Sequence, residues 1–183
     1  MADLRTRTAI AARALEFTIL TAARSGEVLG VGRSEIDIGK KLWTIPAARM
    51  KAAREHRVPL SPRALEIVEE TEKLGAKDLL FPGPKPGAAL SSMAMAMLLR
   101  RMKAEITVHG FRSTFRDWAS ETTGFPHEVC EMALAHTIGN KAEAAYRRGD
   151  LFDKRRNLME AWATYCAAAK TGKVVALRKA AAL

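Results

Sequence analysis

Apolar residues recur at helical spacing along most of the chain. The first such stretch has a broad apolar face, made by Ile10, Ala14, Leu15, Phe17, Ile19 and Leu20. This spacing predicts a helix that Thr8 can cap and that ends near residues 22–24. Ser25 can then cap a short second helix carrying Glu27.

The pattern changes after this point to short apolar runs separated by turn residues. Residues 36–45 form two such runs around Gly39, which predicts two short strands joined by a turn. A basic stretch follows at 49–57, and Val58–Leu60 predicts a third short strand. Together these runs predict a small antiparallel sheet near the N-terminal third of the chain.

The remainder returns to helical spacing. Ser61-Pro62 is a cap followed by a proline at the first helical position, which predicts a helix that Gly75 closes. Residues 81–87 are rich in proline and glycine and predict a loop. Further helices are expected from Ser91 or Ser92 through Met102, from about 111 to 123, from Pro126 through Leu134, from Asn140 across Tyr146, and from about 150 to 169.

The expected fold is therefore mainly α with a small antiparallel β-sheet, an α+β arrangement. A length of 183 residues suits one domain spanning residues 1–183. The helix at 150–169 is the last expected element, and its alanine-rich continuation at 170–183 is expected to detach as a mobile tail.

Charge narrows the class of partner. The chain has 30 Lys and Arg against 20 Asp and Glu, a formal net charge of +10. Nucleic acid is the commonest partner of such a surface, and anionic lipid or RNA is the competitor. The basic residues are spread along the chain without an amphipathic stripe or an aromatic stacking platform, so the lipid and RNA interpretations rank last.

Two further features bear on location. No segment approaches the roughly 18 continuous apolar residues of a membrane span, and the start has no signal-peptide pattern. Cys130 and Cys166 form no disulfide framework, which fits a reducing cytoplasm. We expect a cytoplasmic protein that does not contact membranes.

Several polar residues could handle a phosphate. His109 and Arg112 are three residues apart, so on a helix they project together, yet this spacing is common by chance. Arg24 has Glu27 three residues on, either as a plain ion-pair partner or as a brace for a guanidinium that meets phosphate. Lys51 taken singly is typical of a solvated loop lysine.

Two residues nearer the C-terminus complete the set. His136 taken alone is typical of a histidine beside a helix end, and Tyr146 of a packing aromatic with an exposed hydroxyl. Each of these residues is weak evidence for chemistry. The set becomes informative through its order along the chain and through the residues around each member.

That ordered set resembles the signature of the tyrosine recombinases, the phage integrase family. Four segments carry the resemblance: Thr21–Glu27, Met50-Lys51 leading to Val58–Ser61, His109–Trp118, and Leu134–Trp162 with its Tyr146–Leu151 run. The sequences of these segments are similar to those of integrases from prophages and genomic islands. The resemblance covers nearly the whole chain.

The chain departs from the family pattern at two small residues and at its start. Ala22 and Ala135 stand where many members have glycine, which raises a question about local backbone geometry. Full-length relatives carry a core-binding domain and often an arm-binding domain upstream of the catalytic domain. This chain starts almost at the first catalytic helix, so we expect those domains to be absent from it.

The resemblance implies a reaction and its residues. Tyr146 would attack a DNA phosphodiester and form a 3′-phosphotyrosyl link. Arg24, Arg112 and His136 would hold the phosphate. Lys51 would protonate the leaving 5′ oxygen, and His109 would assist proton transfer or bind the phosphate. Glu27 would orient the pocket.

The resemblance also implies the partners. Site-specific recombination would use double-stranded attachment-site DNA and a tetramer on that DNA, although the isolated domain could be a monomer or dimer. No cofactor and no metal are implied, because side chains supply the cations. His127 and Cys130 have a metal-like spacing, but Cys130 falls on an apolar face, which favours a buried thiol.

Two other functions stay open from sequence. One is a DNA-binding remnant of a prophage integrase with weak or no catalysis. The other is DNA relaxation by the same chemistry, as in type IB topoisomerases. All the expected polar positions are filled, which favours an active tyrosine-type site-specific recombinase.

Overall fold

The computed structural model describes residues 1–73, 78–136 and 149–168. Its helices are α1 (Ala2–Arg5), α2 (Ile10–Thr21), α3 (Ser25–Leu29), α4 (Pro62–Glu72), α5 (Ala94–Arg101), α6 (Gly110–Thr122), α7 (His127–Ala133) and α9 (Phe152–Ala167). Its strands are β1 (Ile36–Asp37), β2 (Leu42–Ile45) and β3 (His56–Pro59), with short 3-10 turns η1 (Arg33–Glu35) and η2 (Ala47–Arg49). The expected fold class, mainly helical with a small antiparallel sheet, is confirmed.

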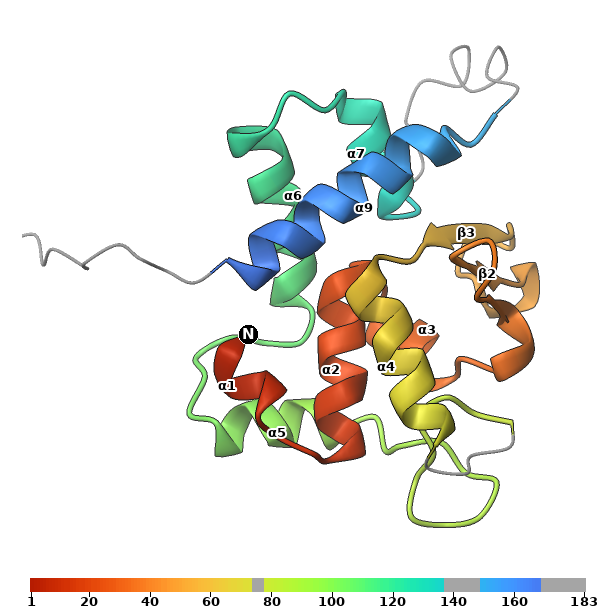
Figure 1. Cartoon of the computed structure of the whole chain (residues 1–183), viewed down its shortest axis with the longest axis vertical. Coiled ribbons are helices and arrows are strands. Elements are labelled where there is room, and N and C mark those ends of the chain that lie inside the picture. The colour runs from red at the N-terminus through yellow and green to blue at the C-terminus, as the bar shows by residue number, and fades with distance from the viewer. Residues whose placement is uncertain (74–77, 137–148, 169–183) are drawn as a thin grey trace, which may run out of the picture.

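Helix α2 is the centre of the fold. It packs against α1, α3, α4, α5 and α9, and Figure 1 shows it beside α4 with α9 crossing above. Every residue from Ala14 to Thr21 is buried, so the helix is covered on all sides. The end of α2, where Arg24 follows, is therefore fixed by several neighbouring elements.

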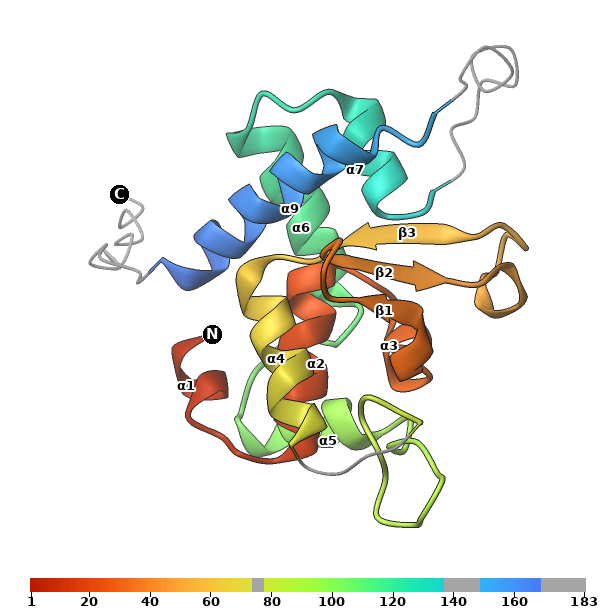
Figure 2. The same cartoon turned by 45° about the vertical axis from the view of Figure 1, so that its right-hand side comes forward.

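The sheet lies beside the end of α2 and α3 (Figure 2). Its strand order is β1-β2-β3, with antiparallel pairing that sets Trp43 opposite Val58 and Ile45 opposite His56. Trp43 and Ile45 point to one face because side chains alternate along a strand, and both are fully buried. The ring of Trp43 lies 5.5 Å from that of Phe17, so this face of the sheet packs on α2.

Helix α9 packs across the C-terminal part of the fold. It contacts β3, α2 and α7, and in Figure 2 it lies above the sheet alongside α6 and α7. Arg155 of α9 is almost fully buried and donates to the backbone carbonyl of Arg57 in β3 and to Oδ2 of Asp150 at 2.7 Å. The sheet and the C-terminal helix are thus joined through a charged hydrogen bond.

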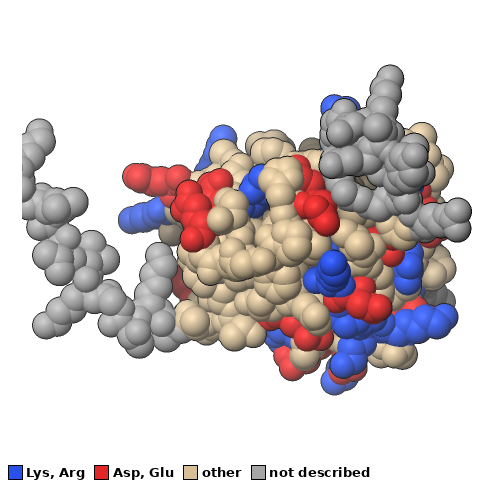
Figure 3. Space-filling view, turned by 90° about the horizontal axis from the view of Figure 1, so that it is seen from above, with Lys and Arg blue, Asp and Glu red and all other residues tan. Residues whose placement is uncertain are grey.

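The surface on the α9 side carries charges of both signs. In Figure 3 acidic and basic side chains lie around a central uncharged area rather than forming one continuous basic face. This distribution agrees with the spread of Lys and Arg along the sequence. In the part of the chain that the structure describes, no helix is long and apolar enough to cross a membrane.

Most helix boundaries match the sequence-based expectations, but several caps do not. Residue Ala9 occupies the cap position of α2 in place of the expected Thr8, and Arg24 precedes α3 in place of Ser25. At α3 the Glu27 carboxylate accepts from the Arg24 backbone N–H at 2.8 Å, the contact by which a glutamate three residues into a helix selects the cap residue, and this makes Arg24 the cap.

Other differences are small. The expected cap of α4 is confirmed, since the Ser61 hydroxyl accepts from Ala64 N at 3.4 Å, and α4 ends at Glu72, before Gly75. Helix α5 begins at Ala94, later than expected, and β3 begins at His56, earlier than expected. Gly75, the expected helix from Asn140 and the tail at 170–183 lie outside the described residues.

A buried carboxylate on α2 ties the N-terminal helices together. The Glu16 side chain is fully buried, with Nε of Arg5 at 2.7 Å, Nη2 of Arg63 at 2.9 Å and Nη1 of Arg13 at 3.7 Å from its oxygens. Burial alone would raise the pKa of Glu16, but the hydrogen bonds and charges of Arg63 and Arg5 outweigh it and lower the pKa below the ordinary 4.5.

We therefore expect stability to depend on the ionisation of Glu16. The contribution of a carboxyl group with a lowered folded-state pKa is complete above its unfolded value and is lost as pH falls through the folded value. Glu16→Gln should lower the free energy of unfolding by about 3 kcal/mol at pH 7. It should also flatten the loss of stability below the ordinary pKa of 4.5, measured by urea denaturation at several pH values.

Glu66→Gln is the matched control. Glu66 also pairs with Arg63, but its carboxylate is 60% exposed, so its loss should change stability by no more than about 0.5 kcal/mol. Equal losses in the two variants would contradict the role given to Glu16.

Candidate active site

The site is organised around Arg112, a buried cation on α6 that is only 5% exposed. Its Nη1 donates to the carbonyl of Ala22 at the end of α2, and its Nη2 donates to the carbonyl of Leu134 at the end of α7, at 2.8 Å. Carbonyls at a helix C-terminus carry partial negative charge and have no partner within their helix. Arg112 thus satisfies two helix ends at once and joins α6 to both.

Each of these helix ends is turned by an alanine in the left-handed conformation. Ala22 has φ 50° and caps α2, while Ala135, with φ 49°, directly follows the Leu134 cap of α7. Glycine adopts this conformation without the steric penalty that a Cβ introduces. Ala22 and Ala135, identified from the sequence as departures from glycine, therefore both lie where the backbone conformation favours glycine.

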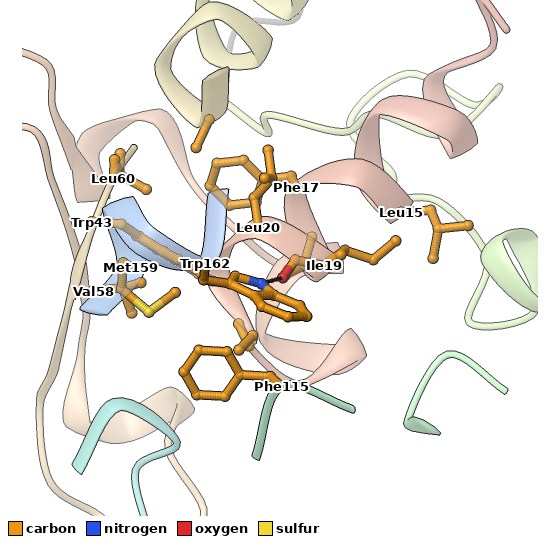
Figure 4. Close-up of a cluster of buried hydrophobic side chains, with 14 of the residues drawn as sticks. Leu15, Phe17, Ile19, Leu20, Trp43, Val58, Leu60, Phe115, Met159 and Trp162 are labelled. Carbon is orange, nitrogen blue, oxygen red and sulfur yellow. Dashed lines mark hydrogen bonds between the residues drawn. The ribbon is translucent and has the colours of Figure 1, made fainter. Parts of the chain in front are cut away.

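The end of α2 is held from a second direction by α9. Trp162 donates its indole N–H to the carbonyl of Ile19 at 2.7 Å, the contact drawn as a dashed line in Figure 4. Its ring packs edge-on against Phe115 of α6, with centroids 5.3 Å apart. The turn that leads from α2 to Arg24 therefore lies between α6 and α9.

Arg24 enters the site from this turn. Its Nη1 donates to Oε1 of Glu27 at 2.7 Å, and the other oxygen of Glu27 accepts from the Arg24 backbone N–H at 2.8 Å. Glu27 is buried, whereas the Arg24 side chain is 30% exposed. One edge of the Arg24 guanidinium is thus fixed by a buried carboxylate while the side chain still reaches solvent.

The two arginines lie close enough to repel each other. Burial and then the charge of Arg24 lower the pKa of Arg112 from 12.5 to about 10, and Glu27 opposes the change. Arg112 stays protonated at neutral pH. No carboxylate among the described residues makes an ion pair with Arg112, so its charge is offset there by two carbonyl dipoles and, without direct contact, by Glu27.

His136 completes the described part of the site. Its Nε2 lies 3.4 Å from Nη2 of Arg112, and its Nδ1 lies 2.8 Å from Oε2 of Glu131. The other oxygen of Glu131 accepts from Nε of Arg116, one helical turn after Arg112 on α6. The structure therefore brings together Arg24, Glu27, Arg112 and His136 from three separate segments: the start of α3, helix α6 and the turn after α7.

No described contact joins the side chain of Lys51 or His109 to this group. Both side chains are exposed, and neither makes a hydrogen bond or ion pair with residues the structure describes. His109 precedes the first residue of α6, which places it three residues before Arg112. Lys51 follows the buried Met50, which fixes the start of its turn.

Arg49, which the sequence places in a basic stretch, has a structural partner. Its guanidinium binds the Glu35 carboxylate and the backbone carbonyl of Glu27. Gly30 allows this approach, because a Cβ there would lie 3.1 Å from Nη2 of Arg49. Arg49 thus connects the turn that carries Lys51 to the helix that carries Glu27.

His56 is a second residue of that stretch whose place in the site could not be recognised from sequence. Burial first, and then the charges of Arg155 and Arg112, lower its pKa from 6.5 to about 4 against the opposing effect of Glu27. His56 is therefore neutral at physiological pH and does not add to the basic surface. An isolated histidine within a basic run carries no sequence signal for such burial.

Tyr146 lies outside the described residues. Cys130 is buried, as expected for a core thiol, and burial raises the pKa of its thiol. His127 is 70% exposed and lies 3.7 Å from Glu131. Within the described ranges, no group of three or more His, Cys, Asp and Glu side chains could hold a metal ion.

Known proteins resemble this chain in sequence and in fold. The family model of the phage integrase family matches residues 1–150. The chain is 38% identical to prophage integrase IntA of Escherichia coli over 161 residues, which are 86% of the chain and 39% of that protein. It is 33% identical to the integrase of enterobacteria phage P4 over 171 residues, covering 83% of the chain and 39% of that protein.

A solved structure supports the fold. The integrase from mycobacterium phage Brujita superposes with a TM-score of 0.66 at 18% identity, covering 84% of this chain and 52% of that one. The chain spans about two fifths of the length of the curated relatives it matches.

The left-handed alanines lead to a prediction about stability. Ala22→Gly and Ala135→Gly remove the clash of a Cβ at positive φ, which outweighs the greater freedom of glycine in the unfolded chain. Each should raise the free energy of unfolding by about 0.5–1 kcal/mol, measured by urea denaturation.

Ala163→Gly is the control, since Ala163 lies within α9 in ordinary helical geometry. That substitution should lower stability by roughly 1 kcal/mol. A loss of similar size at all three positions would show that the left-handed backbone imposes no strain at residues 22 and 135.

Proposed function

Because the chain belongs to the phage integrase family, we propose that it is the catalytic domain of a tyrosine-type site-specific DNA recombinase. The observation that carries the proposal is the buried charge of Arg112. This guanidinium lies beside a second arginine and a histidine and has no ion-paired carboxylate among the described residues. A buried charge is expensive unless it meets a counter-ion, so the site favours an anion.

A phosphodiester fits these donors. A guanidinium presents N–H groups in a planar fork that matches two phosphate oxygens, and a protonated imidazole adds a further donor. Arg24, Arg112 and His136 would contact the non-bridging oxygens. Negative charge grows on those oxygens as phosphorus becomes pentavalent, so the same contacts strengthen in the transition state.

The reaction itself is a transesterification. The phenolic oxygen of Tyr146 bonds to phosphorus, and the bond from phosphorus to the 5′ oxygen of the next nucleotide breaks. Lys51 supplies the proton that the departing 5′ oxygen takes up, and the phenolic proton passes to solvent or to His109. Religation reverses these steps with a 5′ hydroxyl as the nucleophile.

Glu27 serves this chemistry indirectly. It holds Arg24 by two contacts and so fixes the guanidinium before DNA arrives. Preorganised donors stabilise a transition state without reorganisation at the moment of reaction. Arg49 binds the backbone carbonyl of Glu27 in α3 and lies two residues before Lys51. This contact would help to fix the turn that carries the general acid relative to the helix that carries Glu27.

The proposal extends to partners. Double-stranded attachment-site DNA is the substrate, and strand exchange takes place in a tetramer on paired sites within the cytoplasm. The chain corresponds to the catalytic part of its longer relatives. Contacts that select the DNA sequence would come largely from other parts of such proteins.

Covalent capture tests the nucleophile. A duplex nicked close to the crossover site loses a short fragment after cleavage and traps the protein–DNA adduct. The wild-type chain should form an adduct resolved by denaturing electrophoresis, with the DNA mapped to the Tyr146 peptide by mass spectrometry. Tyr146→Phe should form none, because phenylalanine has no hydroxyl, and it should still bind DNA.

The chain has two tyrosines, so Tyr165→Phe is the matched control and should form the adduct at the wild-type rate. Tight DNA binding by the wild-type chain without any adduct would favour the alternative of a DNA-binding remnant that has lost catalysis.

The role of Lys51 is tested by changing the leaving group. Lys51→Ala should slow cleavage of ordinary DNA by roughly 100-fold or more, the usual contribution of a general acid. A substrate with sulfur in place of the bridging 5′ oxygen should restore most of that loss, because a thiolate leaves without protonation. Single-turnover rates on both substrates give the comparison.

Lys85→Ala, which removes an exposed loop lysine, serves as the control and should leave both rates unchanged. An equal loss for Lys51→Ala on the two substrates would assign Lys51 to DNA binding instead of proton transfer.

A further inference from the structure

We propose that Glu131 is a positioning residue that fixes the tautomer and orientation of the His136 ring. The inference rests on the proposed function, in which His136 contacts the phosphate. In the sequence Glu131 lies within an ordinary helical stretch, which gives no sign of a role in the site. The structure places its carboxylate directly against the histidine.

The contacts form a closed loop between two helices. Arg112 and Arg116 lie one turn apart on α6. Arg112 reaches His136 at 3.4 Å, His136 reaches Glu131 at 2.8 Å, and Glu131 accepts from Nε of Arg116. Because both ends of this loop lie on one helix, the imidazole is held at a defined place relative to the Arg112 guanidinium.

The carboxylate of Glu131 remains ionised in this setting. Burial acts to raise its pKa, but the hydrogen bonds from His136 and Arg116 outweigh burial and lower the pKa. An ionised carboxylate can only accept hydrogen bonds. The ring nitrogen that faces it, Nδ1, must therefore carry the proton.

This assignment decides what the other ring nitrogen can do. With the proton on Nδ1, the neutral ring offers the Nε2 lone pair on the side of Arg112, and the protonated ring offers an Nε2 N–H to a phosphate oxygen. In the opposite tautomer the neutral ring would turn an unprotonated Nδ1 towards a carboxylate. The geometry thus selects the form in which Nε2 faces the substrate side and, once the ring is protonated, donates a hydrogen bond to a phosphate oxygen.

Glu131 also differs from a simple surface ion pair. Its side chain is 16% exposed, and its two oxygens bind different partners: Oε2 binds His136, while Oε1 binds Arg116 and also lies 3.7 Å from the exposed His127. Glu70 is a comparable carboxylate outside the site. It pairs with Arg13 and Arg63, and its side chain is 37% exposed. Glu70 therefore provides a matched control for the loss of an ion-paired carboxylate.

The first experiment reads the tautomer without any need for activity. The chain contains four histidines, so long-range proton–nitrogen NMR of a ¹⁵N-histidine-labelled sample is tractable, with His136→Gln identifying the signal. At a pH where the ring is neutral, wild-type His136 should show the Nδ1–H form. Glu131→Ala should shift the population towards Nε2–H, while Glu131→Gln, whose amide oxygen still accepts, should keep more of the Nδ1–H form.

The second experiment measures single-turnover cleavage of the nicked duplex. Glu131→Ala should slow adduct formation by about 10- to 100-fold, the range lost when a carboxylate that orients a functional histidine is removed. Glu131→Gln should recover part of the rate, and Glu70→Ala should match the wild type. In a His136→Ala background, Glu131→Ala should slow adduct formation little further, because both substitutions remove the same function, that of the imidazole.

The outcomes separate the two proposals. No adduct with the wild-type chain would overturn the proposed function, while the NMR comparison still decides the role of Glu131. An Nε2–H tautomer in the wild type, or an unchanged tautomer in Glu131→Ala, overturns the inference. So do additive losses in the double variant. Glu131→Gln preserves side-chain volume, so it tests the idea even if Glu131→Ala does not fold.

Discussion

The architecture of the site depends on one buried guanidinium that satisfies the ends of two helices. Arg112 binds the carbonyls of Ala22 and Leu134, and in doing so it fixes where α2 and α7 stop relative to α6. Arg24 follows the first of these ends by two residues, and His136 follows the second by two residues. A single side chain therefore sets the distance between the other phosphate-binding candidates.

The same contacts explain the electrostatic character of the site. Carbonyl dipoles offset part of the Arg112 charge but do not neutralise it, and Glu27 is engaged with Arg24. Burial first, and then the repulsion from Arg24, lower the pKa of Arg112 to about 10. An anionic substrate would relieve that repulsion, so binding energy and catalytic charge would come from the same residues.

Sequence patterns predicted the structural features that depend on residues close together in the chain. The apolar period of α2 and the start of α4, with Ser61 as cap and Pro62 as first residue, follow from spacing and caps alone. Of the ordered polar residues, the structure places Arg112 beside Arg24 and His136. The glycine-to-alanine departures at Ala22 and Ala135 also marked real left-handed turns. Roles that depend on neighbours remote in sequence could not be predicted. Glu131 gains its partner from α6.

The basic stretch at 49–57 shows the same limit. As sequence, its cations look equivalent, but folding separates them by their partners. Arg49 is taken up by Glu35 and Arg57 pairs with Asp150, while burial keeps His56 neutral. Lys51 retains an exposed ammonium group. Arg54 is likewise exposed, but an arginine does not give up its proton, so Lys51 is the residue of this stretch that suits the general-acid role proposed for it.

The two roles of Arg112 affect how its variants should be interpreted. Replacing it would leave carbonyls at two helix ends without donors, so a loss of activity would mix misfolding with chemistry. Arg24 contributes less to holding helices together than Arg112 does. Its principal contacts are with Glu27, three residues away, and its side chain is 30% exposed. The end of α2 keeps its bonds from Trp162 and Arg112 when Arg24 changes. Variants of Arg24 therefore leave both helix ends in place, but they take the cation from the buried Glu27 carboxylate, so the stability of an Arg24 variant has to be measured beside its activity.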